Sequence, residues 1–151
     1  MIWIITGDRG VGKTTLILKK IQEMKESGRT VYGIITPPLF NDNDEKIGFS
    51  ALNASTGDQW ELARIDKILP GPKFGPFHFS SEGLSKVNNQ MTQFLKAHKK
   101  LIFLDEIGPL ELKHKEGYYP LLRFFNDAAY NQNIYLVIRP ELIEEFVADY
   151  I

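Results

Sequence analysis

The feature that most constrains the fold is a glycine-rich run between a strand-like and a helix-like segment. Residues 7–14 read Gly-Asp-Arg-Gly-Val-Gly-Lys-Thr and match the pattern G-x-x-x-x-G-K-[ST]. The apolar, β-branched residues 2–6 before the run predict a strand buried on both faces and not a signal peptide. Residues 13–27 after the run predict an amphipathic helix that ends at Gly28. This order predicts a phosphate-binding loop in an α/β fold with a parallel sheet.

The predicted loop has a defined chemistry. Its glycines allow backbone N–H groups to form a concave nest for anions, and the following helix N-terminus adds partial positive charge. We expect Lys13 to reach the β- and γ-phosphates and Thr14 to place its hydroxyl on Mg²⁺, while Thr15 contacts the α-phosphate or caps the first helical turn. The alternative is a surface turn with an exposed lysine, which leaves the flanking strand and helix unexplained. The candidate nucleotide-binding residues are Gly7, Asp8, Arg9, Gly10, Val11, Gly12, Lys13, Thr14 and Thr15.

A second motif places two carboxylates directly after an apolar strand. Residues 101–104 are Leu-Ile-Phe-Leu, and Asp105 and Glu106 follow. Successive side chains of a strand point in opposite directions, so the two carboxylates can occupy different parts of one site. Asp105 fits a partner of Mg²⁺, which keeps few carboxylate ligands, and Glu106 fits the group that polarises an attacking water. A solvated acidic turn after a core strand is the alternative.

The remaining sequence predicts an α/β fold built from further strands, helices and one antiparallel insertion. At 151 residues the chain is expected to form one domain, spanning residues 1–151. The hairpin insertion, over about residues 39–66, is expected beside the main sheet or at its edge. We predict buried strands at 30–36, 101–104 and 134–138, helices at 80–97, at 119–131 and from Pro140 onward, and an irregular loop through 70–76.

Composition excludes several classes of protein. The chain has 18 basic and 19 acidic residues and a formal net charge of −1, so no overall field attracts nucleic acid or anionic lipid. No apolar run approaches the length of a membrane span. The chain contains no cysteine, which excludes disulfides and thiol catalysis and is typical of a reducing compartment. We therefore expect a cytoplasmic protein that binds neither membrane nor nucleic acid.

The segment that begins at the two carboxylates carries a resemblance to a known family. Residues 105–112 read Asp-Glu-Ile-Gly-Pro-Leu-Glu-Leu and resemble the D-E-I-G-x-[ML]-E-L signature of the THEP-type nucleoside-triphosphatase family, small P-loop proteins of the RecA/AAA+-like branch. The glycine-rich run, the strand at 33–36, the hairpin at 47–49 and the turn at 56–57 follow the same order. The resemblance implies a P-loop NTPase three-layer sandwich with a mostly parallel sheet and an antiparallel hairpin insertion.

The resemblance also implies an activity. It implies Mg²⁺-dependent hydrolysis of nucleoside triphosphates (ATP, and by loose base selectivity GTP and others) to diphosphate and phosphate. It implies catalytic roles for Lys13 and Glu106, and binding of Mg²⁺ by Thr14 and Asp105. Glu111 belongs to the signature, and we expect it to orient the loop at 105–109.

The chain departs from the family pattern at two places. Pro109 stands where family members commonly have lysine. The chain also stops at Ile151, before the further strand and tail that members usually carry, so we expect a sheet one strand shorter.

Two other functions remain open. In a small nucleotide or nucleoside kinase Glu106 would contact an acceptor instead of water, but the chain has only five arginines for an acceptor lid. In a nucleotide-dependent switch or assembly subunit, slow hydrolysis would time a partner interaction, and a homo-oligomer could supply an arginine in trans. Within the chain, Arg139 after the fourth strand is the candidate phosphate contact, against a role in capping nearby carbonyls. For Phe74, Phe77 and Phe79, packing under the hairpin is favoured over stacking on a base.

Overall fold

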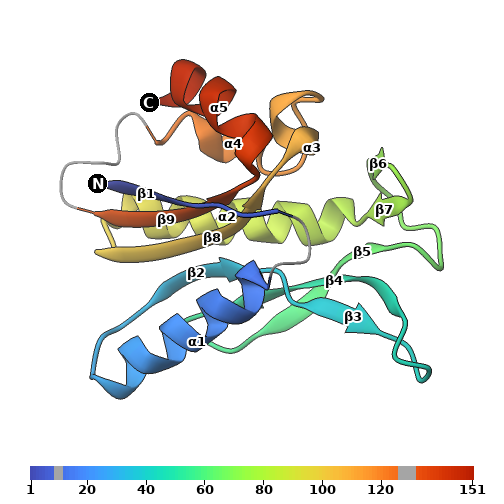
Figure 1. Ribbon diagram of the computed structural model, residues 1–151, viewed down its shortest axis with the longest axis horizontal. Helices are drawn as coiled ribbons and strands as arrows, with labels where there is room; N and C mark the ends of the chain where they lie inside the picture. Colours follow the sequence, from blue (N-terminus) through green and yellow to red (C-terminus); the bar gives the residue numbers. More distant parts are fainter. Residues whose placement is uncertain (9–11, 126–131) are drawn as a thin grey trace.

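The computed structural model describes residues 1–8, 12–125 and 132–151 of the chain, which form a curved sheet with helices on both faces (Figure 1). The strands are β1 Ile2–Ile5, β2 Tyr32–Ile35, β3 Pro38–Phe40, β4 Lys46–Asn53, β5 Gln59–Arg64, β6 Lys73–Phe74, β7 Phe77–Phe79, β8 Leu101–Ile107 and β9 Asn133–Ile138. The helices are α1 Lys13–Glu26, α2 Ser81–Lys96, α3 Pro109–Leu112, α4 Tyr119–Leu122, the 3₁₀ helix η2 Pro140–Leu142 and α5 Ile143–Tyr150. None of the helices in these described ranges is both long and apolar enough to cross a membrane.

The sheet combines a parallel part with an antiparallel extension. Its strand order is β1-β9-β8-β2-β4-β5-β7-β6, and β3 pairs with β4. The pairs β1–β9, β9–β8 and β8–β2 are parallel, whereas β2–β4 and every pair beyond it are antiparallel. The predicted α/β fold class is therefore confirmed. The predicted insertion extends the sheet edge at β2, and its antiparallel part runs further than expected, to Phe79.

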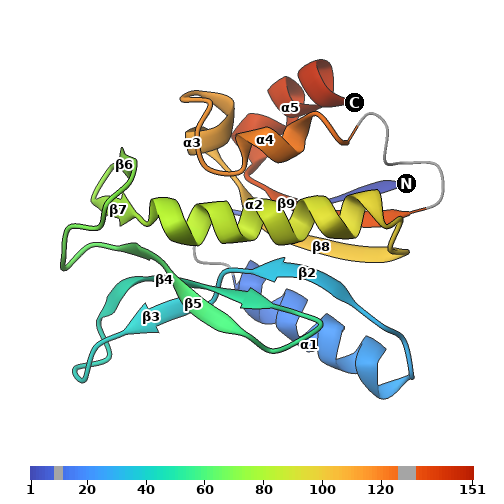
Figure 2. The same ribbon diagram turned by 180° about the vertical axis from the view of Figure 1, so that it is seen from behind.

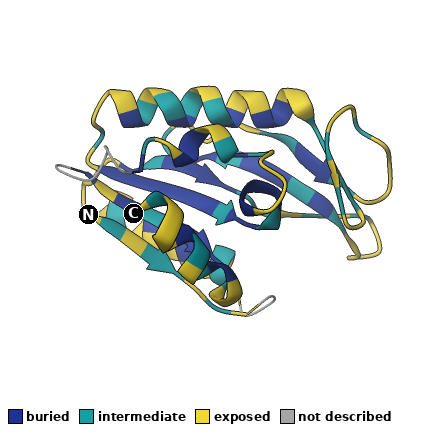
Figure 3. Ribbon diagram, turned by 90° about the horizontal axis from the view of Figure 1, so that it is seen from above, coloured by how far each residue is buried: buried dark blue, intermediate teal, exposed yellow. Residues whose placement is uncertain are grey.

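Both faces of the parallel part are buried, which explains its continuous apolar runs. Along β8, Ile102 and Leu104 point into the core beneath α2 and α5, whereas Leu101 and Phe103 pack on the opposite face with Ile17 of α1. Figures 1 and 2 show α1 and α2 on opposite sides of the sheet. Figure 3 shows the central strands in the colour of buried residues and exposed residues on the outer surface of the helices. These three layers match the predicted sandwich.

A glycine in β2 allows this strand to pair with β8 without a clash of its side chain. Gly33 of β2 has φ 133°, and a Cβ atom at this position would lie 2.0 Å from the carbonyl oxygen of Phe103 in β8. Gly33 pairs with Phe103, and Ile34 pairs with Leu104. This register brings the carboxyl ends of β2 and β8 together, where Thr36 and Asp105 lie.

The prediction of a first strand buried on both faces was wrong. In the described part of the chain β1 pairs only with β9 and lies at the edge of the sheet. Trp3 is 46% exposed and stacks on Tyr135 of β9 with ring centroids 6.0 Å apart. A strand at the edge of a sheet has a neighbouring strand on one side only, so it is covered less completely than a central strand. The apolar sequence of β1 does not reveal this edge position.

Two further predictions need correction. The predicted irregular loop at 70–76 contains the start of the small hairpin of β6 and β7. The helix predicted over 119–131 is only one turn long, because α4 ends at Leu122. Beyond it, the Phe124 N–H donates to the Leu121 carbonyl and the Phe125 N–H donates to the Leu122 carbonyl. This tighter i to i+3 pattern carries Phe125 into the core against Phe146. Residues 126–131 of that prediction lie outside the described residues.

The predicted helix at 80–97 is confirmed together with its cap. Ser80 adopts an extended conformation, and its hydroxyl accepts a hydrogen bond from the Gly83 N–H at 2.9 Å. We predict that Ser80→Ala lowers the free energy of unfolding by about 1 kcal/mol, because one helical N–H loses its acceptor. Urea unfolding followed by circular dichroism measures this change. Ser85→Ala, at an exposed position of α2, is the matched control, and equal stability of the two variants would contradict the capping role.

Candidate functional site

A buried carboxylate connects three elements at the carboxyl edge of the sheet. Asp105 is 1% exposed, and its Oδ2 accepts hydrogen bonds from Thr14 Oγ1 at 2.9 Å and from Thr36 Oγ1 at 3.2 Å. The Thr36 N–H lies 3.4 Å from the same oxygen. Burial raises the pKa of Asp105 to about 6; the Thr14 hydrogen bond opposes this rise and the neighbouring Glu106 carboxylate adds to it. The predicted residues Thr14 and Asp105 are thus brought together.

The glycine-rich run leads into α1 as predicted. Gly12 is the N-cap of α1, which has no side-chain cap, and the Leu16 N–H bonds the Gly12 carbonyl at 3.0 Å. The N–H groups of residues 13–15 therefore precede the first intrahelical hydrogen bond and are available to an anion. Lys13 Nζ donates to the carbonyl oxygens of Gly7 and Asp8. Of the other predicted contacts, Thr15 is exposed, and Arg9, Gly10 and Val11 lie outside the described residues.

The second predicted carboxylate is held by an arginine. Arg139 Nε donates to Glu106 Oε1 at 2.9 Å, and both side chains are partly buried. The contact joins the ends of β8 and β9. Arg139, which was predicted to contact phosphate, therefore lies beside Glu106, the predicted base. Its phosphate contact stays a prediction.

The oxygen atoms around Asp105 suit a hard divalent cation. The Asp105 carboxylate and the Thr14 hydroxyl are the oxygen donors that Mg²⁺ prefers. Across residues 1–8, 12–125 and 132–151, no cluster of three or more His, Cys, Asp or Glu residues could form an all-protein metal site. Mg²⁺ commonly takes one or two carboxylates and completes its shell with phosphate oxygens and water, so this donor set fits it.

A second buried carboxylate fixes the loop that follows Glu106. Glu111 is 4% exposed; its Oε2 accepts from the Gly108 N–H at 2.8 Å and its Oε1 from the Tyr118 N–H at 3.1 Å. Gly117 has φ 63°, and a Cβ atom there would lie 2.4 Å from Glu111 Oε1. Burial raises the pKa of Glu111 to about 7, against the effect of the two N–H donors. These contacts fit the orienting role expected for Glu111.

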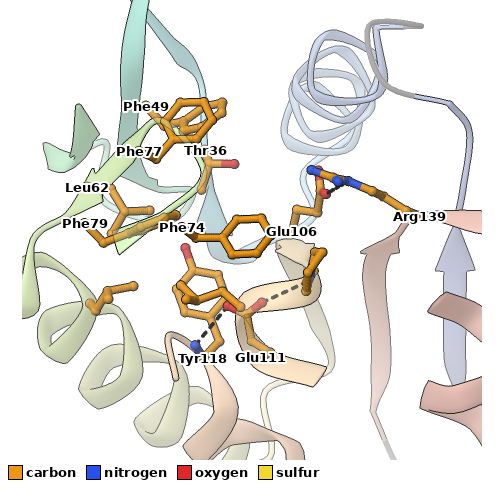
Figure 4. Close-up of a pocket in the computed structure, with 14 residues that line it drawn as sticks. Thr36, Phe49, Leu62, Phe74, Phe77, Phe79, Glu106, Glu111, Tyr118 and Arg139 are labelled. Carbon is orange, nitrogen blue, oxygen red and sulfur yellow. Dashed lines mark hydrogen bonds and ion pairs between the residues drawn. The ribbon is translucent and has the colours of Figure 1, made fainter. Parts of the chain in front are cut away.

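Four phenylalanines lie next to the carboxylates of Glu106 and Glu111 (Figure 4). The ring centroids of Phe49 and Phe77 lie 5.0 Å apart and those of Phe77 and Phe79 6.4 Å apart. Phe74 lies 5.5 Å from the ring of His114. Phe77 and Phe79 pack on each other, as predicted, and Phe77 on Phe49, whereas Phe74 packs on His114. All four rings also line a pocket that reaches Glu106 and Arg139.

Comparison with known proteins identifies a family for this chain. A family model described as NTPase matches residues 2–139. The chain belongs to this NTPase family. Proteins named nucleoside-triphosphatase THEP1 are 34% identical over 110 residues in Caldivirga maquilingensis and 33% identical over 110 residues in Methanopyrus kandleri. Each alignment covers 73% of this chain and 60% or 59% of the relative, so the chain spans about three fifths of these curated relatives. No solved structure matches the chain.

Sequence reasoning missed two residues of this candidate site. Thr36 follows β2 and contacts Asp105, which its place at the end of a strand next to β8 could have indicated. The Tyr118 N–H donates a hydrogen bond to Glu111 Oε1, and Tyr118 also lines the pocket. The sequence has no signal for Tyr118, because the contact depends on how the segment after α3 folds back.

The raised pKa of Glu111 predicts a pH dependence of stability. The folded chain holds the Glu111 proton up to about pH 7, whereas the unfolded chain releases it near the ordinary value of 4.5. Between these values the folded state binds more protons, so the free energy of unfolding falls as pH rises, by at most about 1.4 kcal/mol per pH unit from this group.

Urea unfolding from pH 4.5 to 8 measures this slope, with Glu111→Gln as the comparison. The amide cannot titrate, and its NH₂ faces a backbone N–H donor, so we expect a less stable variant with a shallower slope below pH 7. Equal slopes in the two proteins would contradict the assignment of the titration to Glu111.

Proposed function

We propose that the protein hydrolyses nucleoside triphosphates to diphosphates and phosphate in a Mg²⁺-dependent reaction, with ATP as a substrate and GTP and others accepted. The observation that carries the proposal is the hydrogen bond between Thr14 and Asp105, next to Glu106, because it joins the phosphate-loop helix to the acidic strand end. Membership of the NTPase family supports the same reaction class, and the relatives named nucleoside-triphosphatase support it further.

The triphosphate is bound by the start of α1 and by Lys13. The backbone N–H groups of residues 13–15 and the helix dipole favour phosphate oxygens. Lys13 turns its ammonium from the carbonyls of Gly7 and Asp8 to the β- and γ-phosphates. The predicted contacts from Arg9, Gly10, Val11 and Gly12 belong to the same loop.

The cation site is assigned to Thr14 and Asp105. Held by these two residues, Mg²⁺ would supply positive charge against the phosphate groups. Asp105 is placed to contact it directly or through water, and Thr36 holds the carboxylate in position.

Glu106 is assigned as the base that orients and deprotonates the attacking water. Its Oε1 is held by Arg139 at 2.9 Å, which fixes the carboxylate and leaves Oε2 for the water. The guanidinium group has further donors beyond Nε, and we assign one of them to a γ-phosphate oxygen.

The experiment that tests the function is phosphate release from the four ribonucleoside triphosphates and their deoxy forms, each with and without Mg²⁺. Hydrolysis only with Mg²⁺ supports the proposal, and absence of phosphate release from all eight substrates contradicts it. Rates measured over a range of protein concentrations test the alternative of an assembly that completes the site in trans, since only that alternative gives a concentration-dependent specific activity.

The assignment of Glu106 predicts a specific loss of turnover. Glu106→Gln keeps the shape of the side chain but cannot accept a proton, so we expect kcat to fall by about 10²–10⁴-fold while ATP binding with Mg²⁺ is retained. Steady-state phosphate release and equilibrium binding measure the two quantities. Glu116→Gln, at an exposed position of the same region, is the control, and parental turnover in Glu106→Gln would show that Glu106 is not the base.

A further inference from the structure

Among the described residues, β1, β3 and β6 are the strands at the edges of the sheet, and only β1 lacks the features that protect an edge. β3 starts at Pro38, which has no N–H to donate, and its register with β4 shifts between Leu39 and Phe40. β6 is two residues long and contains Lys73. Proline, irregular register, lysine and short length all keep a sheet edge from pairing with other strands. β1 has four residues in uninterrupted register with β9, and it contains neither proline nor a charged side chain.

The backbone of β1 directs hydrogen-bonding groups to the outside of the sheet. The Met1 carbonyl accepts a hydrogen bond from the Ile134 N–H of β9 at 3.0 Å. Because alternate residues of a parallel strand bond to the same neighbour, the N–H and carbonyl groups of residues 3 and 5 also face β9. The N–H and carbonyl groups of Ile2 and Ile4 therefore point away from β9, to a side where no described strand lies.

On one face of the sheet, a row of stacked aromatic rings reaches this edge. Phe103 of β8 stacks on Tyr135 of β9 with ring centroids 4.6 Å apart and an interplanar angle of 10°. Tyr135 in turn stacks on Trp3 at 6.0 Å and 11°. The Trp3 indole N–H donates to Asn133 Oδ1 at 3.2 Å, which fixes the orientation of the ring. Trp3 is nevertheless 46% exposed, so the row ends on an accessible ring that is already held in place.

We propose that β1 pairs antiparallel with β1 of a second copy of this chain, about a two-fold axis at Trp3. In this register Ile2 lies opposite Ile4 of the second copy as a hydrogen-bonded pair, in which each residue donates to and accepts from the other. Trp3 meets its symmetry mate in the intervening non-hydrogen-bonded pair, where side chains are closest. The row of stacked rings then continues into the second sheet.

The sequence of the edge favours a second copy as the occupant. A two-fold contact uses the same surface on both partners. Residues 1–5 read Met-Ile-Trp-Ile-Ile, so pairing about the central tryptophan sets an apolar side chain opposite another at every position. No charged side chain meets a like charge, which would oppose pairing. An unrelated protein would have to expose an equally apolar and uncharged edge, which natural sheets avoid.

The size of the contact predicts a weak dimer. Residues 1–5 of each copy form the pairing, far fewer than the roughly 20–30 residues a side of a standard interface. We therefore expect the dimer to be populated at protein concentrations of about 0.1–1 mM. Antiparallel pairing directs the carboxyl ends of the two β1 strands to opposite sides of the joined sheet. The two candidate sites, each at the carboxyl edge of its own sheet, do not meet, so the inference does not depend on the proposed hydrolysis.

Sedimentation equilibrium over protein concentrations from about 10 µM to about 1 mM tests the contact. We expect the weight-average mass of the parent to rise from that of one chain toward that of two. Trp3→Lys sets two ammonium groups opposite each other, and we expect it to weaken dimerisation by about 10-fold. Ile68→Lys is the matched control, because it adds the same charge outside β1 at a residue that is 81% exposed, and it should dimerise like the parent. A parent that stays monomeric, or equal dimerisation of Trp3→Lys, would overturn the proposal.

Amide hydrogen exchange, measured by NMR on the parent chain, locates the contact without a variant. We expect the exchange of the Ile2 and Ile4 N–H groups to slow as the protein concentration rises, because these groups gain an acceptor in the dimer. The N–H groups of Trp3 and Ile5 face β9 in the monomer already, so their exchange should change little. A dimer in which the exchange of Ile2 and Ile4 stays the same would place the contact on another surface and overturn the proposal.

Discussion

The hydrogen bonds to Asp105 are the interaction on which the rest of the site depends. An ionised carboxylate with 1% exposure is costly unless donors surround it. Here the donors come from the start of α1 and the end of β2, two segments that meet only in the folded chain. The carboxylate thereby fixes the phosphate-loop helix against the sheet edge, and Glu106, the next residue of the same strand, is partly exposed beside it. Its raised pKa follows from this position.

The parts of the fold that the sequence predicted are those with local patterns. The strand, glycine-rich run and helix around Lys13 have a characteristic order, and Ser80 is a typical N-cap before an amphipathic stretch. Asp105 and Glu106 were predicted because they follow an apolar run. The pairing of Asp105 with Thr14 could be expected, since both motifs lie at the carboxyl edge of a parallel sheet.

The parts that the sequence did not predict depend on contacts between distant segments. The apolar run of β1 looks like that of β9, yet β1 lies at the sheet edge and β9 lies inside the sheet. The turns after Leu122 bring Phe125 against Phe146, a residue distant in the sequence. Glu111 was recognised only as part of a signature, and its two backbone partners become visible when α3 and the segment at Gly117 fold together.

The antiparallel extension gives the site a wall that a parallel core alone does not have. Strands β4, β5 and β7 continue the sheet beyond β2 and bring phenylalanines to within reach of Glu106. The proposed triphosphate site and the pocket thus share the carboxylate of Glu106.

The most direct test of the account is the Mg²⁺ dependence of nucleotide affinity in Asp105→Asn. We measure the dissociation constant of a non-hydrolysable triphosphate with and without Mg²⁺, in the parent protein and in the variant. The account predicts that Mg²⁺ tightens binding in the parent, and that Asp105→Asn loses most of this gain while its Mg²⁺-free affinity stays similar. An equal gain from Mg²⁺ in both proteins would contradict the assignment of Asp105 to the metal and the central claim with it.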